Sequence, residues 1–178
     1  MIREHYSRTK ASNSNAKNLF YGLLCATAVL FVFYCTTPLY KGIIGLFCVA
    51  AITAAVLIYT KYVGVEYFYD ITFDSEGTSI FVVRQVTGKR SSTLCRIDLS
   101  SIVKIERLDA SARKAHKAEA GYINYFYLPT LMPESVLLLK VSSRNERAEI
   151  FIEASDEFAE LLSTYSIEAR SLVAEDDF

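Results

Sequence analysis

The sequence predicts a membrane α-helical hairpin followed by a mainly β domain that ends in one α-helix. Two long uncharged apolar runs lie near the N-terminus, and short segments of alternating hydrophobicity fill most of the chain after residue 63. The 178 residues leave room for the hairpin and one domain of ordinary size. We therefore divide the chain into a mobile basic tail (1–18), the hairpin (19–63), the β domain (64–170) and an acidic C-terminal tail (171–178).

The hairpin is predicted from length and charge. No side chain is charged between Lys17 and Lys41, or between Lys41 and Lys61. Each interval is long enough for one crossing, because a helix needs roughly 20 residues to span about 30 Å of hydrocarbon. We predict helices over about 19–37 and 42–62. Buried helices of a soluble core are the alternative interpretation, which two adjacent uncharged runs of this length disfavour.

The distribution of basic residues predicts the orientation. The tail carries four Lys or Arg residues against one Glu, whereas the link between the runs carries only Lys41. By the positive-inside rule the N-terminus lies in the cytoplasm, and the second crossing returns the domain to the same side. A cleaved secretory signal is disfavoured, since the first run is long and a second run follows it. We expect a multi-pass protein of the cell (plasma or inner) membrane with both termini cytoplasmic.

Small residues in the runs suggest helix packing faces. They recur four apart at Gly22 and Ala26, at Ala50 and Ala54, and at Ala51 and Ala55. Such pairs let helices approach closely in lipid, either within the hairpin or between copies of the chain. The alternative is that alanine is simply common in membrane helices. Neither run contains Asp, Glu, Lys, Arg or His, which disfavours a two-helix transporter or channel unless an oligomer builds a pore from Thr27 and Thr53.

Seven segments after the hairpin have the alternation typical of β-strands. They are residues 65–73, 78–86, 91–97, 101–108, 122–128, 135–141 and 148–153. The first four are predicted to form a meander, and the polar stretch 109–121 a loop or a short helix. Ser155 is the expected N-cap of the C-terminal helix. The expected apolar stripe of that helix is Phe158, Leu161, Leu162 and Tyr165.

Three phrases carry a resemblance to a known family. They are residues 69–73 with Gly77, residues 96–102 with Ile105-Glu106, and Glu157-Phe158 with Leu161-Leu162. From Asn18 to Tyr165 the chain resembles bacterial membrane proteins in which a pleckstrin-homology-like (PH-like) domain follows a pair of transmembrane helices. The resemblance implies a seven-stranded antiparallel β sandwich or barrel, capped by the C-terminal helix, on the cytosolic side. It brings no catalytic residues to these positions.

No catalytic, cofactor-binding or metal-binding residues are predicted. The histidines are His5 in the tail and His116, which we expect to be a solvated loop residue. The four cysteines show neither metal-site spacing nor a disulfide framework, and the glycines form no phosphate-binding loop. A net charge of -1 lacks the basic excess of a nucleic-acid binder. We expect a protein that is not an enzyme.

Charged residues also bear on lipid binding. The turn at residues 74–77 is acidic, so we expect no specific phosphoinositide binding there. Basic residues that are candidates for contact with an anionic membrane surface are Lys61, Lys89, Arg90, Arg113, Lys114 and Lys117. The alternative for the last three is a solvated loop, balanced by Glu119.

These observations predict a non-catalytic integral membrane protein that presents a PH-like domain for protein binding or self-assembly, which is compatible with a regulatory role. Its expected partners are the bilayer and either another protein or further copies of the chain. Two alternatives stay open. One is an accessory subunit of a larger membrane enzyme or transporter, and the other is a lipid-handling domain with a pocket in the sheet interior.

Overall fold

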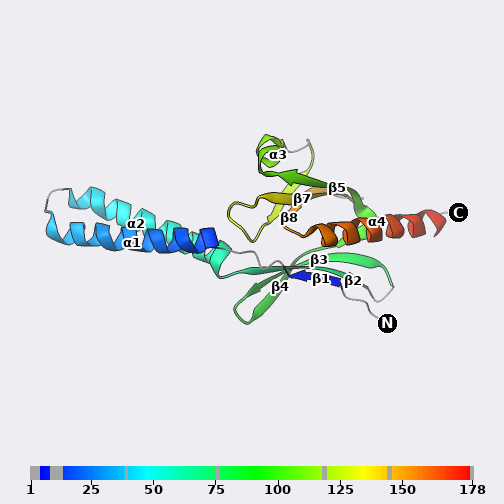
Figure 1. Ribbon diagram of the computed structural model, residues 1–178, viewed down its shortest axis with the longest axis horizontal. Helices are drawn as coiled ribbons and strands as arrows, with labels where there is room; N and C mark the ends of the chain where they lie inside the picture. Colours follow the sequence, from blue (N-terminus) through cyan, green and yellow to red (C-terminus); the bar gives the residue numbers. More distant parts are fainter. Residues whose placement is uncertain are drawn as a thin grey trace. The chain divides into compact units, whose positions relative to one another are not determined.

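The computed structural model describes residues 5–8, 14–38, 40–74, 77–117, 120–143 and 146–176. The chain divides into two compact units. One is a pair of apolar helices, and the other holds two β-sheets and the C-terminal helix (Figure 1). This confirms the predicted succession of two apolar helices, a mainly β region and a terminal helix.

The helical unit consists of α1 (Ser14–Thr36) and α2 (Lys41–Ile58), and α2 continues into a π-helical turn, η1 (Tyr59–Val63). Both helices are long and apolar enough to cross a membrane, and almost none of their residues is buried. Helices of a soluble core would be mostly buried, so the exposed apolar surface favours contact with lipid. The first helix begins at Ser14, within the stretch expected to be a mobile tail.

Polar side chains in these helices are satisfied locally. The hydroxyls of Thr27, Thr53 and Thr60 each donate to the carbonyl oxygen four residues earlier, at 2.8 to 2.9 Å. A hydrocarbon environment requires this, because an unpaired polar group there costs several kcal/mol. Threonine is therefore compatible with both spans.

The helices face each other through a regular seam. Partly or fully buried positions recur three and four residues apart: Phe20, Leu23, Thr27 and Leu30 on α1, and Ile44, Cys48, Ala51, Ala55 and Ile58 on α2. This spacing is typical of left-handed helix packing. Near the link, a Cβ added to Gly45 would be in ordinary van der Waals contact with Cε2 of Tyr34, at 3.5 Å.

The first sheet has the order β1-β2-β3-β4 and is antiparallel throughout. Its strands are β1 (His5–Arg8), β2 (Glu66–Phe73), β3 (Ser79–Thr87) and β4 (Arg90–Asp98). The expectation of an unstructured tail over 1–18 is therefore wrong for β1. Its four residues lack an apolar alternation, and the pairing partner that orders them, β2, lies some 60 residues away in the sequence.

The second sheet has the order β5-β7-β8-β6. Its strands are β5 (Ile102–Asp109), β6 (Ile123–Tyr127), β7 (Ser135–Ser142) and β8 (Arg147–Ile152). All seven predicted strands thus exist, but the predicted four-stranded meander is wrong. The 3-10 turn η2 (Leu99–Ser101) carries the chain into the second sheet, where β5 pairs with β7.

The predicted all-antiparallel sandwich is also wrong in one pairing. β6 runs parallel to β8, at the edge of the sheet, while β7 and β8 form an antiparallel hairpin. Strand alternation is the same for either direction of pairing, so the sequence pattern could not distinguish them. Within the described residues the two sheets do not close into a barrel.

The main core lies between the sheets and α4 (Asp156–Asp176). The Phe158 ring contacts those of Tyr69 and Phe81, with centroids 6.5 and 6.4 Å apart. The Tyr69 hydroxyl donates to the Tyr127 carbonyl oxygen at 2.6 Å and so ties β2 to β6. The buried residues of α4 are Phe158, Leu162, Ser166 and Ala169.

Helix α4 begins as predicted, because the Phe158 amide donates to Oγ of Ser155 at 3.3 Å. Two expectations for this helix were wrong. Leu161 is exposed, since the buried stripe advances by four residues from Phe158 to Leu162. The helix also continues to Asp176, through most of the expected acidic tail.

A smaller core lies on the outer face of the second sheet. It contains Leu108, Val136, Leu138 and Phe151, with Leu128 packed against it. The short helix α3 (Ala110–Ala115) lies beside β5 and β7. It is capped by Asp109, whose Oδ1 accepts from the Ala112 amide at 2.7 Å. Of the two alternatives for residues 109–121, the short helix is therefore correct.

Candidate functional site

An open cleft of about 590 Å³ lies between β4 and β6. Each of these strands is an edge strand, one of the first sheet and the other of the second. We call it the β4–β6 cleft. Its apolar floor is formed by Ile97, Val141, Ala148 and Ile150. The volume is within the range of about 300–1,000 Å³ that is typical of ligand sites.

Two tyrosines form one wall of the cleft. Tyr125 and Tyr127 are two residues apart on β6 and share a face, with their rings stacked at a centroid distance of 6.2 Å and an angle of 8°. The Tyr125 hydroxyl donates to Oε1 of Glu146 at 3.0 Å. The Tyr127 carbonyl oxygen accepts from the Tyr69 hydroxyl, which fixes the backbone at this end of β6.

Cys95 contributes to the opposite wall and hydrogen-bonds to the side chain of Tyr127. Burial raises the pKa of the Cys95 thiol to about 11 and that of the Tyr127 hydroxyl to about 12. Both groups are therefore protonated at neutral pH. The thiolate is the reactive form of cysteine, so Cys95 is not an activated nucleophile. What the cleft offers to a ligand is apolar surface, aromatic faces and hydrogen bonds.

Charged groups stand at the rim of the cleft. Asp98 and Glu146 are exposed carboxylates in its lining. Arg96 also belongs to the lining, but its Nη2 lies 2.9 Å from Oδ2 of Asp74. This ion pair offsets the positive charge of Arg96, so the charged side chains that the structure describes at the rim are predominantly acidic.

A second hollow of about 370 Å³ includes Asp70 and Arg84 in its lining. Asp70 is only 2% exposed, and its Oδ2 lies 2.5 Å from Nε of Arg84. A buried carboxylate needs such a partner to remain charged. We therefore assign this pair a structural role.

The third arrangement is a cluster of His116, Lys140 and Glu149, which lies largely out of solvent. Glu149 on β8 is fully buried, and its Oε2 lies 2.8 Å from Nε2 of His116. The Lys140 ammonium lies 3.5 Å from Oε1, which is within ion-pair range but too long for a good hydrogen bond. The expectation that His116 is solvated was wrong: it packs edge-on against Phe151 and its side chain is only 20% exposed.

The sequence contains one signal for this cluster. Glu149 interrupts the apolar run of β8, opposite Lys140 of β7. The sequence pattern does not show that the segment with α3 folds over the outer face of the second sheet. The cluster shares that face with the smaller core, and we assign it a structural role.

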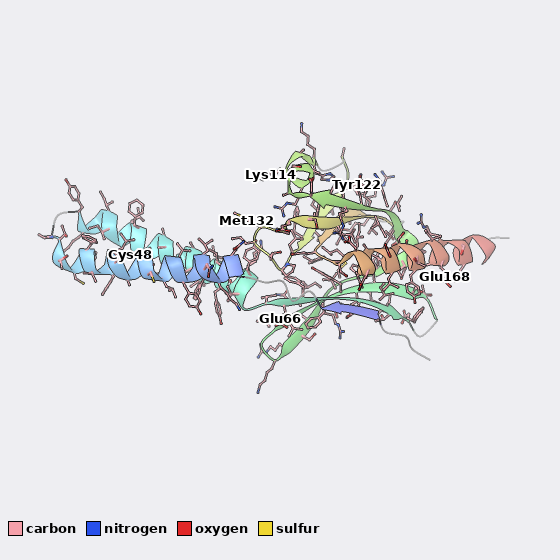
Figure 2. All side chains as sticks on the ribbon, in the orientation of Figure 1. Cys48, Glu66, Lys114, Tyr122, Met132 and Glu168 are labelled. Atoms are coloured by element: carbon pink, nitrogen blue, oxygen red, sulfur yellow. The ribbon has the colours of Figure 1, made fainter. Side chains whose placement is uncertain are left out.

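The structure separates the predicted basic surface residues. Lys89 and Arg90 lie at the turn between β3 and β4, whereas Arg113 and Lys114 lie on α3, at the other side of the domain (Figure 1). Lys114 projects outward from α3 (Figure 2), and the exposed Lys117 follows that helix. The predicted basic residues of the β domain thus fall into two separate groups. Lys61 lies in η1, with its ammonium 5.5 Å from the centre of the Tyr62 ring.

The predicted small residues are divided between the helical seam and the exposed faces. Gly22, Ala26 and Ala50 are exposed, whereas Ala51 and Ala54 are partly buried. A Cβ added to Gly22 would meet nothing within 4 Å. Packing of Gly22, Ala26 and Ala50 within the hairpin is therefore not observed. Their contact between copies of the chain stays a prediction. Ala55 is the buried small residue of α2.

Neither metal-binding groups nor similarity to known proteins adds to the description of the site. Among the described residues, no group of three or more His, Cys, Asp or Glu side chains is arranged to hold a metal ion. Comparison of this chain with protein-family models, with curated proteins and with solved structures finds no match in any of the three. The cleft and the cluster of His116, Lys140 and Glu149 are therefore interpreted from their own geometry.

Proposed function

We propose that this chain is a non-catalytic, membrane-anchored binding module whose binding surface is the β4–β6 cleft. The observation that carries this proposal is the open cleft beside two stacked tyrosines, with a protonated thiol and no activated nucleophile in its lining. The α1–α2 hairpin serves as the anchor. The PH-like character suggested by the order of strands and helix belongs to this proposal.

Strand pairing supports a hairpin that crosses the membrane twice. β1 precedes α1 and β2 follows α2, yet the two strands pair, with His5 opposite Ile71. This pairing supports a placement of both ends of the hairpin on the same side of the bilayer. The excess of basic residues before α1 then favours the cytoplasmic face of a plasma or inner membrane.

This orientation is tested by labelling single introduced cysteines in intact cells with a membrane-impermeant maleimide. Lys41→Cys, at the start of α2, should be labelled from outside, whereas Lys114→Cys on α3 should be labelled only after lysis. The unmodified chain controls for its four native cysteines. Labelling of Lys114→Cys in intact cells would contradict the cytoplasmic placement.

The binding role is tested by site-specific photocrosslinking in native membranes. A benzophenone amino acid replaces Tyr125 in the cleft or, as the matched control, Phe126, the next residue on β6 and 55% exposed. Adjacent strand residues point to opposite faces, so only the first probe lies in the cleft. We expect an adduct specific to position 125. The proposal is refuted if both positions give the same adducts, or if position 125 gives none.

A further inference from the structure

The β4 edge has features of a site for strand addition. Within the described residues, β4 pairs only with β3, so its other edge is open. The stretch Leu94–Asp98 lines the cleft and spans roughly 16 Å at about 3.3 Å per residue. Native proteins usually cover or interrupt such an edge, because it presents unpaired amide and carbonyl groups.

The usual means of protection are only partly present on β4. The ladder shifts between Val83 and Arg84, which leaves Leu94 as a bulged residue. Beyond the bulge the strand is regular, with Cys95 opposite Val83 and Ile97 opposite Phe81. The segment contains two charged residues: Arg96 is engaged by Asp74, and Asp98 is the last residue of the strand. The regular part of the strand, Cys95–Asp98, belongs to the lining of the cleft.

The walls of the cleft match the repeat of an extended chain. Cys95 and Ile97 are two residues apart on β4, as are Tyr125 and Tyr127 on β6. An extended peptide places alternate side chains on one face, so those that point inward would meet apolar and aromatic surface. The mixed polar and apolar lining suits a peptide backbone better than a lipid chain, which has no hydrogen bonds to offer.

We propose that the occupant of the β4–β6 cleft is an extended peptide segment that adds as a strand to the β4 edge. This inference rests on the proposed function and names its partner class. The segment carries apolar side chains at alternate positions and at least one Lys or Arg, since Asp98 and Glu146 make the rim acidic.

The test is a selection from a phage-displayed library of random nine-residue peptides on the full chain in detergent micelles. Enriched peptides should alternate apolar and polar residues and include a basic residue. Tyr125→Ala should weaken their binding by about tenfold, as expected for loss of an aromatic contact. Phe126→Ala, on the other face of β6, should leave binding unchanged.

Two further variants separate strand addition and charge recognition from simple apolar contact. N-methylation of alternate peptide amides removes the donors that a β4 ladder needs and should abolish binding. Glu146→Lys should weaken binding of a basic peptide. The same variant should bind a peptide in which the Lys of the peptide is replaced by Glu. Glu134→Lys is the control, at an exposed carboxylate away from the cleft.

The inference is overturned if no peptide is enriched, if Tyr125→Ala leaves affinity intact, or if N-methylated peptides still bind. Its failure is distinguishable from failure of the proposed function. If position 125 crosslinks to a lipid or to a second copy of this chain, the cleft is still a binding site, but the proposal that an extended peptide occupies it is refuted. An absence of any adduct at position 125 would refute both.

Discussion

Glu149→Ala should strongly destabilise the β domain. The substitution removes a fully buried carboxylate and leaves His116 and Lys140 without it, although their side chains are only 20% and 21% exposed. Removing one partner of a buried ion pair typically costs about 3–5 kcal/mol. For a domain of this size, that loss lowers the unfolding temperature by roughly 10–20 °C.

The measurement is urea or thermal unfolding of the full chain in detergent micelles. The signal is near-ultraviolet circular dichroism of the tyrosines, because the chain has twelve tyrosines and no tryptophan. His116→Ala removes a hydrogen bond to a charged group, worth about 1.5–3 kcal/mol. Glu134→Ala is the control, since an exposed carboxylate should change stability by no more than about 0.5 kcal/mol.

A double-mutant cycle then tests the contact itself. If His116 acts mainly through Glu149, the two losses should be non-additive by about 1–3 kcal/mol. Additive losses would show that the 2.8 Å contact does not contribute to stability. A loss below about 1 kcal/mol for Glu149→Ala would refute the argument that this carboxylate is buried and paired.

Two further predictions concern the cleft and α4. Burial raises the pKa of the Cys95 thiol to about 11, so iodoacetamide should alkylate it about 100-fold more slowly at pH 8 than a thiol with the ordinary pKa of 9.0. The alkylation rate, followed by peptide mass spectrometry, should rise as the pH increases through 11. Since the folded-state pKa lies above the unfolded value, the thiol should also lose its contribution to stability as pH rises from about 9 to 11; rapid alkylation at pH 8 would contradict both statements. Ser155→Ala should cost about 1 kcal/mol in thermal unfolding through loss of the α4 cap, whereas Ser155→Asp should restore it. Equal stability of the two variants would contradict the capping role.

Much of the fold could be predicted because its determinants are local. The two uncharged runs predicted the helices, and alternation predicted seven strands close to their observed bounds. Ser155 identified the start of α4 because an N-cap acts on amides within one turn.

The candidate site could not be predicted in the same way. Cys95 and Tyr127 are on strands of different sheets, so their meeting depends on how the sheets pack. The sequence showed a cysteine in a strand-like segment and a row of tyrosines, but no spacing that relates them. His116 and Glu149 are likewise brought together by the path of the chain over the second sheet.

The sequence by itself thus determined the elements: two apolar helices, seven strands and a capped terminal helix, because periodicity, charge and capping act over a few residues. Only the tertiary structure decided which strands pair. It placed β5 in the second sheet, β6 parallel to β8 and β1 beside β2. Pairing depends on contacts between residues far apart in sequence, and it is this pairing that leaves the β4 and β6 edges open and creates the cleft between them.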